Sequence, residues 1–396
     1  MRNLLAGSMI LLAGAGALAG ARVETIDARI LAGEVVGISP ESILLKTDKG
    51  KQALPLGEVL EIAFAEAADA METLGQRAVA TSLGDLLAVS DLAFDGKKLR
   101  VNSSLLGPAE LPMDVVTVLY LPPAGQGPRD VADILREMKL PPASGDRMLV
   151  ARKGAQPLAV DGVIEVIGPE KITFRWKDEA RTIARDSVRM VCLAAVSDET
   201  PGQKGVLLGR DGSTLSFTAL TLRDKTLRVE SAGVGKHAVP LDRVAGIRLA
   251  SDRVSRLADL KPDAVKEHGY FDTTFHYRAN QSVAGGPLRL GGRTHRAGLG
   301  LHSFCELTYR LDGRYFTFVA TVGIDDGVRP GGDATLTFLG DGKPLAKELR
   351  LTGRDAPQPV RIRLTGVKTL LIRVDFGADG LDFCDHVDLA GARLIK

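Results

Sequence analysis

The chain has 396 residues, of which 45% are hydrophobic and 25% are charged. This length exceeds that of one small domain, and the composition is that of a folded protein, so wholesale disorder is excluded. Lys and Arg number 51 against 49 Asp and Glu, a balance that argues against a nucleic-acid binder. Three cysteines without a CxxC spacing exclude a dense disulfide framework and disfavour a structural zinc site.

Residues 1–21 have the pattern of a signal peptide. A short basic start precedes an apolar run from Leu4 to Ala19, and Ala17-Leu18-Ala19 is a small-x-small cleavage site. The alternative is an uncleaved membrane anchor, which the short, Gly- and Ala-rich run disfavours. We therefore expect an exported protein, periplasmic, cell-surface or secreted, with no transmembrane segment after cleavage.

Four segments of the next 230 residues share one ending, after strand-like alternation of apolar and polar residues. The endings read LPLGEVLEI, LPMDVVTVL, IARDSVRMV and VPLDRVAGI, and they align on Pro55, Pro112, Ala184 and Pro240. A valine follows each anchor by four residues, and an aliphatic residue follows it by seven: Val59 and Ile62, Val116 and Leu119, Val188 and Val191, Val244 and Ile247. This predicts four copies of one β unit.

Two interpretations of these repeats remain open. At roughly 55 residues each, the copies suit small SH3-like or Sm-like barrels, and the alternative is hairpins that merge into one or two larger sheets. We place repeats 1 and 2 in 22–125 and repeats 3 and 4 in 146–256. Between them, 126–145 is expected to be a linker with a short helical insert, because apolar residues at helical spacing precede Pro141-Pro142.

The last third of the chain has longer, cleaner alternation. Strand-like runs are separated by turns such as Asp312-Gly313 and Asp341-Gly342, which predicts a two-sheet β-sandwich over 262–396. LADLKP at 257–262 is expected to be a polar hinge before it. The predicted fold class is therefore all-β: a C-terminal sandwich preceded by small barrel-like repeats.

Several motifs in this region resemble the NPCBM domain, a family of carbohydrate-binding modules. They are GGPLRLGGR (285–293), GLGLHS (298–303), LTYRLDGRYFTFVATVGIDD (307–326), FLGDGK (338–343) and DHVDLAGARLI (385–395). The resemblance covers about 261–395 and implies a jelly-roll β-sandwich that binds sugars of the galactose type in some members. The chain departs from the family's closing motif, which usually has a Trp where this chain has Leu389 and often an Asp where it has Gly391. The side chain at position 389 is either part of the sugar site or part of the core.

The candidate ligand-binding residues are the polar groups within these motifs: His302, Asp325, Asp326, Asp385, His386 and Asp388. His302 is either a donor to a sugar hydroxyl or a hydrogen-bonded structural histidine. The cluster from Asp385 to Asp388 either faces a ligand or forms a buried network. Asp325 and Asp326, with the glycines that follow, either hold a Ca²⁺ ion or cap their own turn.

The cysteines Cys305 and Cys384 are expected either to pair across neighbouring strands in an oxidising compartment or to be two buried thiols. No nucleophile elbow, zinc-protease motif or phosphate loop is present. The sequence therefore predicts a non-catalytic, exported protein that binds a glycan through its C-terminal sandwich, with no cofactor other than a possible Ca²⁺. Its repeats would be spacers or contact modules for envelope proteins. The alternatives are an envelope interaction protein without sugar binding and, third, a glycoside hydrolase.

Overall fold

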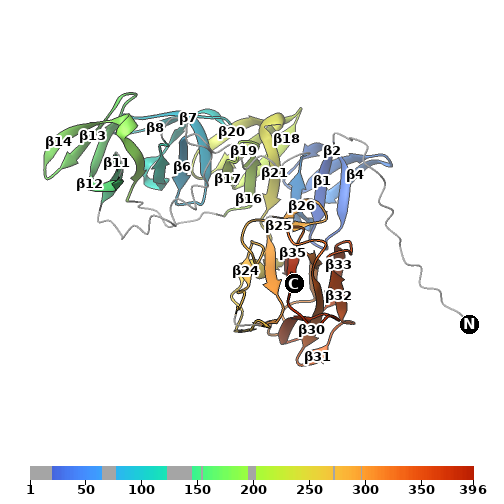
Figure 1. Ribbon diagram of the computed structural model, residues 1–396. Coiled ribbons are helices and arrows are strands. Elements are labelled where there is room, and N and C mark those ends of the chain that lie inside the picture. The colour runs from blue at the N-terminus through green and yellow to red at the C-terminus, as the bar shows by residue number, and fades with distance from the viewer. Residues whose placement is uncertain are drawn as a thin grey trace, which may run out of the picture.

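The computed structural model describes residues 20–64, 77–122, 145–152, 155–194, 202–270, 273–295 and 297–396. The expected helical insert at 129–140 and almost all of the expected signal peptide lie outside these residues. Within them, none of the helices has the length and apolar character needed to cross a membrane. The chain forms a row of four small β-barrels, with a β-sandwich packed against one end of the row (Figure 1).

Each barrel consists of short antiparallel strands followed by a single 3₁₀ turn and a closing strand. The first contains β1 (Ala21–Thr25), β2 (Ile30–Ile38), β3 (Ser42–Thr47), β4 (Gly50–Pro55), η1 (Leu56–Glu58) and β5 (Val59–Ala63). The second contains β6 (Arg77–Thr81), β7 (Leu86–Phe94), β8 (Leu99–Ser103), β9 (Gly107–Leu111), η3 (Met113–Val115) and β10 (Val116–Tyr120).

The third and fourth barrels follow the same plan. The third contains β11 (Asp146–Arg152), β12 (Ala155–Ile167), β13 (Lys171–Trp176), β14 (Glu179–Ala184), η4 (Arg185–Ser187) and β15 (Val188–Cys192). The fourth contains β16 (Gly205–Gly209), β17 (Thr214–Phe217), β18 (Ala219–Arg223), β19 (Thr226–Ser231), β20 (Gly235–Pro240), η5 (Leu241–Arg243) and β21 (Val244–Leu249). In every copy the closing strand returns to pair with the first strand. The predicted β units are thus confirmed as small barrels.

The shared sequence ending is the corner that closes each barrel. The anchors Pro55, Pro112, Ala184 and Pro240 are the residues that cap the four 3₁₀ turns, and the valines four residues later begin the closing strands. All four valines are buried in the barrel cores. Proline suits the cap because its fixed φ fits the extended geometry there.

A β-bulge explains why two buried positions are three residues apart, an odd spacing for a strand whose faces alternate every residue. In the first barrel the pairing with β1 skips Leu60, so Val59 and Ile62 both face the core. The closing strands of the other three barrels have register shifts next to the corresponding valine. The bulge therefore sets the spacing that the sequence repeats.

The barrels are not arranged in chain order. The closing strands of the first and fourth barrels pair antiparallel through Ile62 and Ile247, and those of the second and third through Leu119 and Val191. The fourth barrel then joins the second where Thr214 of β17 pairs with Leu86 of β7. The spatial order is therefore first, fourth, second, third, as Figure 1 shows from right to left. These contacts between strand edges also join all the barrel strands into one continuous hydrogen-bonded sheet. The structure therefore combines the small barrels of one sequence interpretation with the merged sheet of the other.

The sandwich consists of two sheets and a separate hairpin. One sheet contains β22 (Val254–Arg256), β24 (Arg278–Ala279), β27 (Gly298–His302), β29 (Thr317–Ile324), β33 (Gln358–Arg363) and β35 (His386–Ile395). The other contains β23 (Ala264–Glu267), β28 (Cys305–Arg310), β30 (Asp333–Gly340), β31 (Lys343–Pro344), β32 (Leu349–Thr352) and β34 (Thr369–Phe376). The hairpin is β25 (Leu288–Leu290) with β26 (Arg293–His295). Phe318 and Phe338 pack in the core between the sheets, with ring centroids 5.2 Å apart.

The segment expected to be a polar hinge belongs to the sandwich. Strand β22 pairs with β35, and the 3₁₀ turn η6 (Leu257–Asp259) that follows it buries Leu257 completely in the sandwich core. LADLKP carries charged side chains at Asp259 and Lys261, but the buried side chain of Leu257 anchors the segment in the core. The expectation of an exposed hinge at 257–262 was therefore wrong.

The sandwich contacts the first barrel directly. The guanidinium group of Arg393 on β35 donates to the carbonyl oxygens of Thr25 and Ile26 and pairs with Glu24 at 2.8 Å. Ile26 also packs against Val319 and Ile395 of the sandwich. Arg393 is almost fully buried and Glu24 is partly exposed, so the contact depends on this pair to compensate the buried charge of Arg393.

Candidate functional site

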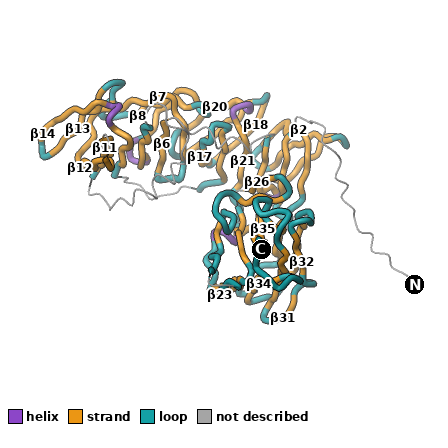
Figure 2. Tube along the Cα trace, viewed as in Figure 1, coloured by secondary structure: helices purple, strands orange, loops and turns teal. Residues whose placement is uncertain are grey.

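Three loop segments meet at the end of the sandwich where β27 and β35 pair through His302 and His386. The segments are 268–270 with 273–277, then 302–305, and 376–386. The ring of His268 stacks on Phe304 at 4.6 Å, and the amide of Tyr270 donates to Asp382 at 2.9 Å. We call these segments the loop edge. Loops and strands of the sandwich can be followed in Figure 2.

His302 and His386 lie together at this loop edge. Their ring centroids are 5.3 Å apart, and Phe275 stacks on His302 at 4.3 Å. The Nδ1 atom of His302 donates to the carbonyl oxygen of Ser303 at 2.7 Å, which fixes the ring and leaves Nε2 as the acceptor of a neutral imidazole. Burial lowers the pKa of both histidines, so both rings are neutral at pH 7.

Asp385 is buried beneath the same loops. Its carboxylate accepts the hydroxyl of Ser303 at 2.6 Å and the amide of Asp333 at 2.8 Å, which ties the loop before β35 to β27 and β30. Burial raises the pKa of Asp385 to about 6. Its role in this geometry is to position the loops.

Asp388 and Asp325 form a second buried pair, further along β35. The amide of Arg289 on β25 donates to both carboxyl groups, at 3.1 Å to Asp388 and 3.2 Å to Asp325. Burial and the hydrogen bond with Asp325 raise the pKa of Asp388 to about 9. At neutral pH Asp388 is therefore a protonated acid, because burial and the adjacent carboxyl group of Asp325 both disfavour its charged form.

Asp326 holds the tip of the hairpin β25–β26. Its two oxygens accept the amides of Gly291 and Gly292, at 3.0 Å and 2.7 Å. Asp325 also accepts the amide of Gly327 at 2.8 Å. These carboxylates thus cap backbone amides, and the described part of the chain contains no group of three His, Cys, Asp or Glu side chains arranged to hold a metal ion.

Exposed aromatic side chains gather at the loop edge, and the sequence analysis did not single them out. The side chain of Phe383 is 75% exposed and that of Tyr270 is 50% exposed, and Phe275 and Leu381 are also exposed. Exposed apolar groups that cluster in this way are typical of binding surfaces. Their sequence signal was aromatic residues in Gly- and Asp-containing stretches that lack strand alternation, as in GYFDTTFHY and GLDFCDH.

The structure places Leu389 in the core. It is fully buried on β35, between Leu299 of β27 and Val322 of β29. The side chain at the position of the family's Trp therefore packs between the sheets and does not contribute to a surface.

The thiols of Cys305 and Cys384 are both free in this structure. Cys305 faces the interior beside Glu267, and its Sγ donates weakly to that carboxylate at 3.8 Å. Cys384 lies against Gly331 and Gly332 in the loop before β35. The structure therefore contains no bridge between them, and of the two expected buried thiols only Cys305 is buried, because Cys384 is partly exposed.

Comparison with known proteins identifies the sandwich. The family model of the NPCBM/NEW2 domain matches residues 253–395. A Renibacterium salmoninarum protein named "Putative endo-alpha-N-acetylgalactosaminidase" is 36% identical over 90 residues, which is 23% of this chain and 6% of that protein. The chain thus spans only a small fraction of this curated relative.

Two solved structures from Clostridium perfringens are similar. A CBM51 module of GH95 in complex with methyl-galactose is 22% identical, with a TM-score of 0.32, over 36% of this chain and 99% of that one. CBM51-2 in complex with GlcNAc, with the INT domains of ZmpB, is 20% identical, with a TM-score of 0.33, over 57% of this chain and 43% of that one.

Proposed function

Because residues 253–395 form an NPCBM/NEW2 domain, we propose that the protein is an exported, non-catalytic carbohydrate-binding protein and that this sandwich binds the glycan. The four barrels are its spacer or its contact surface for envelope proteins. The expected signal pattern of residues 1–21 supports export.

The loop edge is the proposed glycan site. The observation that carries this is the exposure of Phe383, Tyr270 and Phe275 on linked loops of the matched domain. A sugar ring presents an apolar face and a rim of hydroxyls, so a site for it needs an apolar platform with a few polar groups beside it. The neutral rings of His302 and His386 lie next to Phe275 and supply such groups.

The six predicted residues then divide into two roles. We assign His386, and His302 beneath Phe275, to the glycan surface. The four aspartates Asp325, Asp326, Asp385 and Asp388 position the loops and the hairpin through the backbone amides that they accept.

The experiment is a glycan array with the full chain, followed by calorimetric titration of the glycans that bind. Phe383→Ala should weaken binding about tenfold without changing the melting temperature, because the side chain is exposed. Tyr270→Ala should weaken binding to a similar extent and lower the melting temperature slightly, because the ring also contacts Phe376 edge-on at 5.9 Å. Phe316→Ala is the matched control: it removes an exposed phenylalanine of the same sandwich that lies outside the three loop segments.

A second comparison separates surface from interior. His386→Ala should weaken glycan binding by roughly 1–3 kcal/mol, whereas Asp388→Ala should mainly lower the melting temperature because Asp388 is fully buried. No binding of the wild type to galactose-, glucose- or hexosamine-containing glycans at millimolar concentration would refute the proposed function. The envelope interaction protein without sugar binding would then replace it.

A further inference from the structure

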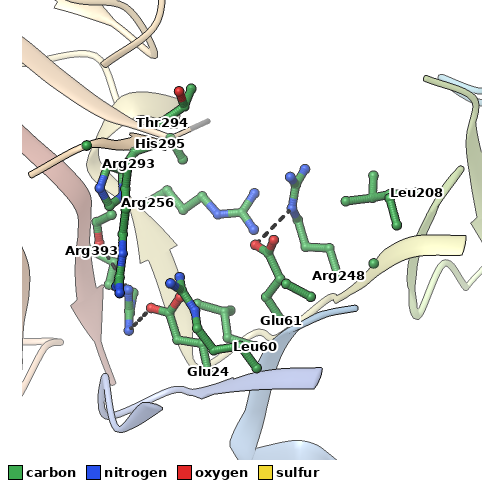
Figure 3. A pocket seen from close by; sticks show the side chains of 17 residues that line it. Glu24, Leu60, Glu61, Leu208, Arg248, Arg256, Arg293, Thr294, His295 and Arg393 are labelled. Atoms are coloured by element: carbon green, nitrogen blue, oxygen red, sulfur yellow. Dashed lines mark hydrogen bonds and ion pairs between the residues drawn. The ribbon is translucent and has the colours of Figure 1, made fainter. Parts of the chain in front are cut away.

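A cavity of about 510 Å³ lies where the sandwich meets the first and fourth barrels (Figure 3). Its walls come from β1 and β5 of the first barrel, from β16 and β21 of the fourth, and from β22, β26 and β35 of the sandwich. The volume is within the range of roughly 300–1,000 Å³ that small-molecule sites have. The cavity exists only in the assembled chain, because three separate units line it.

The cavity is strongly cationic. Five arginines line it, Arg22, Arg248, Arg256, Arg293 and Arg393, against the two carboxylates of Glu24 and Glu61. The carboxylates are already engaged: Glu24 pairs with Arg393 at 2.8 Å, and Glu61 with Arg248 at 3.8 Å.

Three of the arginines lack a partner. The side chains of Arg22, Arg256 and Arg293 make no direct hydrogen bond or ion pair with any residue that the structure describes. Burial and the nearby charge of Arg248 lower the pKa of Arg256, and the more distant carboxylates of Asp259 and Glu61 offset this effect only in part. The side chains of Arg256 and Arg248 enter the space from the sandwich and the fourth barrel respectively (Figure 3).

The hairpin that carries Arg293 is fixed in place. Asp326 accepts the amides of Gly291 and Gly292, the two residues directly before Arg293. His295, on the same strand, also lines the cavity, and burial and the charge of Arg22 lower its pKa, so it is neutral and does not add to the charge. The unpaired guanidinium groups are thus presented by a braced hairpin and by regular strands.

We propose that this cavity binds a small oxyanion, a carboxylate, sulfate or phosphate group, free or carried by a molecule of monosaccharide size. Planar guanidinium groups bind such groups through two parallel hydrogen bonds, and a partly buried site weakens the competition from water. The ligand would be held by the first barrel through Arg22, and by the sandwich through Arg256 and Arg293. It would therefore strengthen the docking of the sandwich on the barrels.

This site is separate from the loop edge. Ala297 and Gly391 border the cavity, and His302 and His386 lie at the other end of the same β27–β35 pair, about 13 Å along the strands at ~3.3 Å per residue. The proposal does not depend on glycan binding at the loop edge, and Phe383→Ala should leave oxyanion binding unchanged.

The test uses the full chain at constant ionic strength, because exposed charges are screened by salt. Inorganic phosphate, inorganic sulfate and glucuronate are titrated by calorimetry, with glucose as the uncharged probe. We expect saturable binding of at least one anion and a melting temperature that rises with its concentration. Any binding of glucose at the loop edge should be the same in the wild type and in Arg256→Met. Tighter binding of glucuronate identifies an acidic sugar as the ligand class, and tighter binding of phosphate or sulfate identifies a free inorganic oxyanion.

Two variants test the assignment. Arg256→Met keeps the aliphatic stem but removes the charge, and Arg293→Gln removes the charge at the hairpin; each should weaken binding at least tenfold. Arg223→Gln, at an exposed arginine of the fourth barrel outside the cavity, is the matched control and should bind as the wild type does.

The unliganded Arg256→Met variant should melt at the same temperature as the wild type or higher, because it removes a charge whose burial and repulsion by Arg248 outweigh its attraction to Asp259 and Glu61. This checks that lost binding is not lost folding. Equal affinity of the wild type and Arg256→Met for every anion, or no saturable binding of any of the three anions, would overturn the proposal.

Discussion

Ser216 of the fourth barrel donates its backbone amide to the buried carboxylate of Asp85 in the second barrel, at 2.6 Å. The contact has a counterpart: the amide of Ala88 in the second barrel donates to the hydroxyl oxygen of Ser213 in the fourth, at 2.9 Å. Each hairpin thus caps an amide of the other, on either side of the paired strands β7 and β17. The two central barrels are therefore joined by polar contacts that are reciprocal and buried.

We expect Asp85→Ala to lower the free energy of unfolding by about 1–3 kcal/mol, because the Ser216 amide would stay buried without an acceptor. Asp85→Asn keeps an acceptor oxygen and removes the charge. Since burial raises the pKa of Asp85, the Asn variant should be as stable as the wild type at pH 7. Urea denaturation of both variants measures the difference, and equal losses would contradict the role of the acceptor.

The boundary of the sandwich can be tested with two fragments. Residues 253–396 include β22 and the buried Leu257, whereas 262–396 lack both. We expect the longer fragment to fold and melt cooperatively and the shorter one to melt several degrees lower, because it loses a strand of the sheet and a core side chain. Amide dispersion by NMR and thermal melts provide the measurement. Equal melting temperatures would restore 262 as the boundary.

The pair Asp388 and Asp325 predicts a pH dependence. The pKa of Asp388 is raised to about 9 in the folded protein, against about 4 in an unfolded chain. Between these values the folded state retains a proton that the unfolded state loses, so this group makes stability fall as pH rises from about 4 to 9.

Asp388→Asn should remove that contribution, because the amide stays neutral and can still donate to Asp325. Its stability relative to the wild type should increase as pH rises from 5 to 9, in denaturation curves measured at each pH. The contribution of Asp385, whose pKa is about 6, should persist in both proteins. A constant difference across this range would mean that Asp388 is ionised in the folded state.

Leu389→Trp would restore the residue usual in the family. Because Leu389 is fully buried between neighbouring strands, we expect the larger ring to overpack the core and to cost about 1–3 kcal/mol. Leu389→Met, which keeps the volume, should cost less. Thermal melts and glycan titrations on the same samples provide the readouts, and stronger glycan binding by the Trp variant would show that the position acts at the surface.

The repeats could be recognised from the sequence because each copy closes at the same corner. Pro55, Pro112 and Pro240 cap a 3₁₀ turn, and that local geometry leaves the same residues at the same spacing. The order of the barrels could not be predicted in this way. Ile62 and Ile247 are both ordinary core residues in their own copies, and nothing local in either segment says which other copy will pair with it.

Part of the candidate site could be predicted from the sequence because its residues lie in recognisable strand motifs. His302 and His386 do meet, and Asp385 and Asp388 lie in the same region, because a strand pair brings them together. Their burial could not be deduced from the strand pattern, since polar residues are usually assigned to the outer face. Phe383 was missed because the candidate residues were taken from the polar groups of the motifs, whereas Phe383 is an apolar residue in the loop before β35, which exposes it.

The interleaved order of the barrels has a consequence for how the chain is made. A ribosome delivers the first barrel long before the fourth, so the edge of β5 remains without its partner β21 until residue 249 has emerged. The second and third barrels, whose closing strands pair with each other, can be joined in the meantime. An unpaired strand edge is a template for wrong partners, including the same edge on another nascent chain. Synthesis that stalls between the third and fourth barrels should therefore yield chains that associate with one another through β5.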